Sequence, residues 1–134
     1  MARIIKEIQV GNRKLTALFD TGSVNTYIRA ELAPPNRIAM KHPFRVGLGG
    51  KRNEIKEECI IEGEIDGLGF STDSYLIDDL GRIDGKPLDL IIGARTMEGW
   101  ETRLDPKAGE LDLTGLKKRE FIEGCAGSTA KQSD

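Results

Sequence analysis

An alternating stretch from Ile55 to Ile65 constrains the fold of this chain more than any other feature. Its apolar members are Ile55, Cys59, Ile61 and Ile65, and the charged members between them are Lys56, Glu58, Glu62 and Glu64. A period of two is typical of a strand with one face buried and the other in solvent. Glycine makes up 16 of the 134 residues, which favours turns over long helices. The chain is therefore predicted to be all-β, a barrel or sandwich of short strands.

Further strands are expected on both sides of this stretch. Apolar residues alternate before and after Gly11–Asn12, which predicts a hairpin with a tight turn. Three glycines between positions 47 and 50 predict the tip of a long hairpin. The remaining expected elements are short strands at 27–28 and 70–77, a buried strand at 88–93, a short helix at 94–100 that Gly99 closes, and a turn at 105–109 between two short apolar segments.

Length and charge limit the classes of protein that this chain can belong to. With 134 residues it has room for one ordinary domain, and we expect this domain to span residues 1–116, followed by a polar tail at 117–134. The net charge is −2 and no basic block stands out, so a nucleic-acid partner is not expected. No apolar run reaches the roughly 18 residues of a membrane helix, and residues 1–7 lack a signal-peptide core. We therefore expect a cytoplasmic protein without a membrane partner.

The segment Asp20-Thr21-Gly22-Ser23 carries the strongest chemical signal. It follows the apolar run Ala17-Leu18-Phe19, and a carboxylate at the end of a buried strand is costly unless something satisfies or uses it. Thr21 and Ser23 offer hydroxyl groups to orient this carboxylate, and Gly22, which has no side chain, leaves room for a substrate backbone. Other chemistries lack parts: His42 is the only histidine, so neither a zinc site nor a Ser-His triad is complete. Cys59 fits a small core residue better than a nucleophile.

Three motifs in order make the chain similar to the retropepsin-like aspartic proteases, in particular their cellular and prokaryotic branch. The motifs are the apolar-Asp-Thr-Gly-Ser segment at 18–23, the glycine-rich hairpin tip at 47–50, and Leu90-Ile91-Ile92-Gly93 followed by a helical stretch. The resemblance extends from about Ile4 to Leu113. It implies a closed barrel of short antiparallel strands with one short helix after the Ile-Ile-Gly strand.

The resemblance also implies an aspartic endopeptidase with a definite set of site residues. Because the chain carries a single Asp-Thr-Gly, a homodimer would supply Asp20 twice, and the two carboxyls would activate one water molecule. The implied catalytic loop and dimer lock are Thr21, Gly22 and Ser23; the implied flap over the peptide or protein substrate is Gly47, Leu48, Gly49 and Gly50; and the implied support behind the loop is Ile92 and Gly93. No metal or organic cofactor is implied.

Some features depart from the viral members, and two other functions stay open. Val24 and Asn25 stand where viral members have acidic residues, and Arg95 lies one place later than the viral arginine after the Ile-Ile-Gly motif. The aspartate also resembles the nucleophile of haloacid-dehalogenase phosphatases, but Gly22 stands where their acid would be. The other alternative is a non-catalytic module that dimerises or binds peptides through the same fold.

Overall fold

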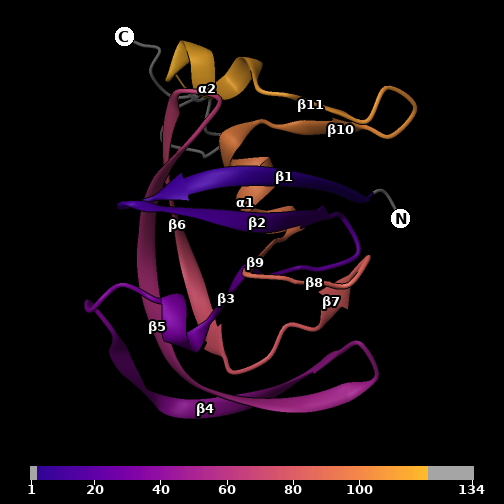
Figure 1. Ribbon diagram of the computed structural model, residues 1–134. Helices are drawn as coiled ribbons and strands as arrows, with labels where there is room; N and C mark the ends of the chain where they lie inside the picture. Colours follow the sequence, from indigo (N-terminus) through magenta and orange to yellow (C-terminus); the bar gives the residue numbers. More distant parts are fainter. Residues whose placement is uncertain (1–2, 121–134) are drawn as a thin grey trace, which may run out of the picture.

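The computed structural model describes residues 3–120, and strands dominate it (Figure 1). The strands are β1 (Arg3–Val10), β2 (Arg13–Asp20), β3 (Tyr27–Arg29), β4 (Ile38–Leu48), β5 (Lys51–Ile65), β6 (Leu68–Ile77), β7 (Arg82–Ile83), β8 (Lys86–Pro87), β9 (Leu90–Ile92), β10 (Arg103–Asp105) and β11 (Glu110–Asp112). The helices are a single 3₁₀ turn (Ala30–Leu32), α1 (Ala94–Trp100) and α2 (Thr114–Lys118). The predicted all-β class is confirmed.

The main sheet has seven strands and closes into a ring of pairings. Its order is β1-β2-β9-β3-β6-β5-β4, and β1 also pairs with β5 through Gln9–Glu64 and Val10–Gly63. Where β1 meets β5, the two backbones lie so close that a Cβ at Gly63 would be 2.2 Å from the Gln9 carbonyl oxygen, so only glycine fits there. Strand β4 stays outside the ring as the partner of β5. Two pairings, β2 with β9 and β3 with β6, are parallel, so the expectation of antiparallel strands holds only for the others.

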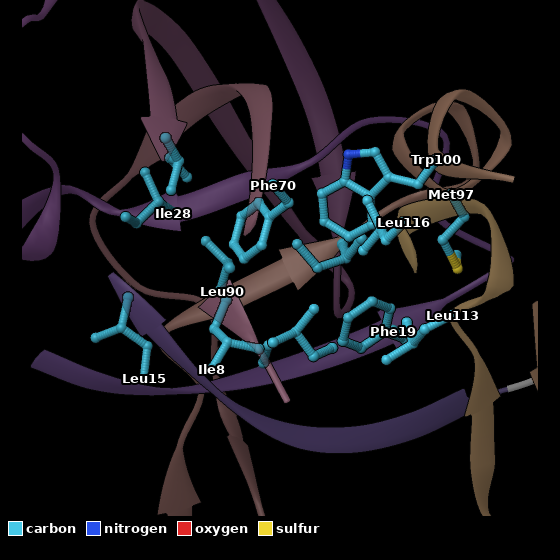
Figure 2. Packing of buried hydrophobic residues seen from close by; sticks show 14 of the residues in the cluster. Ile8, Leu15, Phe19, Ile28, Phe70, Leu90, Met97, Trp100, Leu113 and Leu116 are labelled. Atoms are coloured by element: carbon cyan, nitrogen blue, oxygen red, sulfur yellow. The ribbon is translucent and has the colours of Figure 1, made fainter. Parts of the chain in front are cut away.

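The alternation along β5 is confirmed by burial. Its four predicted inward residues, Ile55, Cys59, Ile61 and Ile65, are at most 2% exposed. The larger core cluster gathers around Trp100, whose ring centroid lies 4.8 Å from that of Phe70 and 6.5 Å from that of Phe19 (Figure 2). The indole Nε1 donates a hydrogen bond to the Ser71 carbonyl at 3.1 Å, so burying this amphipathic ring leaves no donor unpaired.

A second cluster lies on the other side of β2 and β9. It contains Leu18, Tyr27, Ile55, Ile77, Leu80, Leu88 and Ile91, and the partly buried Phe44 and Leu48 of β4 pack against it. Leu18 belongs to this cluster and Phe19 to the first one, as the opposite orientation of successive strand residues requires. Strand β2 therefore has core on both faces up to its last residue, Asp20.

Several local predictions need correction or addition. Helix α1 has the predicted bounds, but the residue that closes it is Glu101, in the left-handed conformation (φ 56°), and not Gly99. Helix α2 and the small β7–β8 hairpin were not predicted. Helix α2 continues across the expected domain boundary after residue 116, and the Arg119 Nη1 donates to the Gly69 carbonyl at 2.8 Å. The division at 116 stays a prediction, and most of the predicted tail lies outside the described residues.

Within residues 3–120, no helix has the length and apolar character that crossing a membrane requires.

Candidate active site

Asp20 lies at the end of β2, where the chain turns sharply. The Gly22 backbone N–H donates to Asp20 Oδ1 at 2.8 Å, and the Ser23 N–H donates to the Asp20 carbonyl at 3.1 Å. The Asp20 side chain is 18% exposed. The loop backbone thus fixes one carboxylate oxygen, and the side chain remains accessible to solvent.

Arg3 faces this carboxyl from the neighbouring strand. Its Nε lies 3.8 Å from Asp20 Oδ2, and 55% of the arginine side chain is exposed. Because the guanidinium side of the pair is exposed and the distance is long, solvent largely screens this interaction. Sequence reasoning missed Arg3, although a signal was present: a two-residue turn at Gly11–Asn12 fixes a hairpin register that pairs residue 3 with residue 20, as the structure shows.

The loop after Asp20 rests on the start of α1. The Ala94 N–H donates to the Ser23 carbonyl at 2.7 Å, and the Arg95 N–H donates to the Val24 carbonyl at 3.1 Å. A Cβ at Gly93 would lie 2.2 Å from the Asn25 carbonyl oxygen, so this contact excludes any side chain there. Ile92, fully buried, pairs in parallel with Phe19. The Ile-Ile-Gly strand therefore lies directly behind the Asp20 loop.

Threonine hydroxyl groups form hydrogen bonds between the Asp20 loop, α1 and β6, and the sequence did not predict these contacts. The Gly93 N–H donates to Thr26 Oγ1 at 3.1 Å, and Thr96 Oγ1 lies 2.6 Å from Thr26 Oγ1 and 2.8 Å from Thr72 Oγ1. Each threonine is unremarkable within its own segment, so only the fold reveals the cluster. Ser23 was expected to help hold the carboxylate with its hydroxyl, but Ser23 Oγ donates to the Asn25 carbonyl at 2.9 Å.

The tip of the β4–β5 hairpin approaches Asp20. Leu48 pairs with Lys51 across a two-residue turn in which Gly49 (φ 57°) and Gly50 (φ 79°) both adopt positive φ, the conformation of a tight hairpin turn. A cavity of about 350 Å³ has Asp20 and Ser23 in its wall together with Leu48 and Gly49. Two of the predicted flap residues and the predicted catalytic residue therefore border one space.

The rest of the cavity wall comes from a segment that was not among the predicted site residues. Residues 79–83, which lead into and form β7, line the cavity together with Leu88 and Ile91. The sequence gives little warning of this, since β7 and β8 have only two residues each and show no periodicity. Within the part of the chain that the structure describes, no three His, Cys, Asp or Glu side chains gather as they would to bind a metal ion.

Comparison with known proteins identifies the fold. No protein-family profile and no curated protein sequence matches the chain. Among solved structures, the chain is similar to the retroviral protease-like domain of Ddi1 from Leishmania major, with a TM-score of 0.62 and 19% sequence identity. The match covers 85% of this chain and 90% of that one. The chain therefore has a retropepsin-like fold, and at this identity the likeness concerns the fold alone.

Proposed function

We propose that this protein is an aspartic endopeptidase that works as a symmetric homodimer. The observation that carries the proposal is the placement of Asp20: a backbone-anchored carboxyl at the end of a buried strand, in the wall of a cavity that also contains the β4–β5 tip. The retropepsin-like fold supports the same interpretation. A carboxyl in this position is accessible to a water molecule. It also lies beside the β4–β5 hairpin tip, which could cover a bound peptide.

The chemistry requires two carboxyl groups around one water molecule. The ionised carboxyl takes a proton from the water, and the protonated one donates a hydrogen bond to the peptide carbonyl oxygen. Two carboxyls a few ångströms apart share one proton, because ionising both is costly, and their apparent pKa values belong to the pair. Asp79 also lines the cavity, but it lies on an exposed loop where its Oδ1 accepts the Gly81 N–H at 2.8 Å. A second copy of Asp20 is the better source of the other carboxyl.

A twofold dimer would bring the two Asp20 loops together. Val24, next to this loop, is 61% exposed, and a partner subunit that meets the loop would bury it. In this arrangement Thr21 and Gly22, exposed at the loop tip, would meet their counterparts across the axis. The dimer thus completes the active site as well as covering apolar surface.

The substrate would lie between the Asp20 loops and the hairpin tips. An extended peptide can pair with strand edges through its backbone and place alternate side chains in pockets. Closure of the tip at Gly47–Gly50 would exclude water other than the reacting molecule and fix the scissile bond. No step needs a metal ion or an organic cofactor.

Cleavage of a diverse peptide library at acid and neutral pH tests this proposal. The native protein should cleave internal peptide bonds, and Asp20→Asn should lose nearly all activity while its sedimentation coefficient stays that of the native dimer. Undiminished activity in Asp20→Asn would refute the mechanism. Peptide binding without turnover in the native protein would instead favour the non-catalytic binding module.

A further inference from the structure

The cavity beside Asp20 has an apolar floor. Leu18, Leu80, Leu88 and Ile91 line it, and each is at most 9% exposed. Leu48 of the hairpin tip and Ile83 of β7 add partly buried apolar surface to the wall. A cavity with such a floor can bind an apolar side chain. The polar and charged groups at its rim then determine which residues can lie next to that side chain.

The rim of the same cavity is predominantly cationic. Arg3, Lys51 and Arg82 line it, and all three are exposed. Arg82 Nη1 donates to the Gly85 carbonyl at 2.8 Å, which orients the guanidinium but leaves its charge uncompensated. In the part of the chain that the structure describes, Lys51 and Arg82 make no ion pair, whereas Arg3 faces Asp20 at 3.8 Å. Asp79 is the carboxylate left to oppose them.

This positive rim is built by the fold and not by a basic stretch of sequence. Its members come from β1, from the hairpin tip and from β7, three segments far apart along a chain whose net charge is −2. Local positive potential at a cavity mouth attracts and orients anionic groups even when the whole protein is acidic. The charge is therefore concentrated where the substrate would enter.

We propose that the cavity takes an apolar side chain of the substrate and that Lys51 and Arg82 select peptides with an acidic residue beside it. This inference rests on the proposed function, since it assigns the substrate class of that site. Exposed charge pairs each contribute modestly, so Glu in place of Gln on both sides of the apolar residue should raise kcat/KM by about fivefold at low salt. In 1 M salt the Debye length falls to about 3 Å, and the preference should shrink to less than about twofold.

Matched peptides test the selection separately from catalysis. Each pair carries one central Leu and differs only in having Glu or Gln on both sides of it. Cleavage by the native protein is compared with binding of the same peptides, fluorescently labelled, to Asp20→Asn, at low and high salt. The double variant Lys51→Gln/Arg82→Gln removes the rim charge. The control for the change in net charge is Arg13→Gln/Lys14→Gln, which removes two exposed positive charges at the end of β2 far from Asp20.

The expected result is a preference for Glu peptides that Lys51→Gln/Arg82→Gln abolishes and that Arg13→Gln/Lys14→Gln retains. Equal binding and cleavage of Glu and Gln peptides would overturn the inference while leaving the peptidase proposal intact. Preferential binding of Glu peptides without any cleavage would support the inference and refute the proposed function. A preference that persists in Lys51→Gln/Arg82→Gln would also overturn it, because the rim would then not be its source.

Discussion

At the scale of single residues, Gly93 shows how far the Asp20 loop depends on one missing side chain. A Cβ there would lie 2.2 Å from the Asn25 carbonyl oxygen and 2.8 Å from the Val24 carbonyl carbon. Both are backbone atoms of the loop, so neither can rotate away as a flexible side chain would. Gly93 also donates its N–H to Thr26 Oγ1, which couples its position to the threonine cluster.

We predict that Gly93→Ala lowers the free energy of unfolding by about 1–3 kcal/mol, the usual cost of overpacking, because the loop must move. Urea denaturation measures this change. Gly99→Ala is the matched control: it lies in α1 with nothing within 4 Å of its ideal Cβ, and alanine favours a helix by up to about 1 kcal/mol. Equal stability of the two variants would show that the close approach at Gly93 does not constrain the loop.

Cys59 gives a second test at this scale. Burial raises the pKa of its thiol, although nearby Arg37 opposes the shift. The folded protein therefore keeps this proton to a higher pH than the unfolded chain. Any resulting stability is present in full below the ordinary thiol pKa of 9.0 and is lost as pH rises through the folded value.

The chain has one other cysteine, Cys125, and its replacement by serine leaves Cys59 as the single thiol. With this variant, Cys59 should react with a disulfide reagent at pH 8 at least about tenfold more slowly in the native protein than in urea, because the thiolate is the nucleophile. Absorbance of the released thiol gives both rates. Similar rates in the two conditions would mean that the Cys59 side chain is not buried and that the pKa of its thiol is not raised.

At the scale of elements, local patterns predicted the β1–β2 and β4–β5 hairpins, whereas contacts between residues distant in sequence decided how the other elements pair. Alternation along β5 predicted its buried face, and the Gly11–Asn12 turn was sufficient to set the β1–β2 register. Nothing in Leu90–Ile92 reveals that β9 lies between β2 and β3, because a fully buried strand shows no alternation. The threonine cluster and the β7 wall of the cavity were missed for the same reason: their members meet only in the folded chain.

The hairpin tip makes a prediction that belongs to an element. Gly49→Ala/Gly50→Ala places two side chains at positive φ, at a cost of about 1–2 kcal/mol for each residue. Neither added Cβ would have an atom within 4 Å, so the protein should still fold. We expect kcat/KM for a peptide to fall by at least about tenfold because the geometry of the turn changes. Gly47→Ala, which has open space and no positive φ, should keep the native unfolding free energy. An unchanged kcat/KM in the double variant would show that the hairpin tip has no role in the proposed mechanism.

At the scale of the whole molecule, the closed ring of strands is the frame that carries the proposed half of an active site. Pairing of β1 with β5 leaves the ring without a free edge, and β4 extends from it as a hairpin arm. Strand β2 of the ring ends at Asp20, and the tip of the arm lines the adjoining cavity. One such unit supplies one anchored carboxyl, and the proposed chemistry requires two.

Mixing native protein with Asp20→Asn tests this requirement most directly. After subunit exchange at a constant total concentration, activity is measured against the native fraction. If both Asp20 carboxyls of a dimer are needed, an equal mixture should retain about one quarter of the native activity, because only native–native pairs work. Retention of about one half, in proportion to the native fraction, would show that each chain acts alone and would contradict the account.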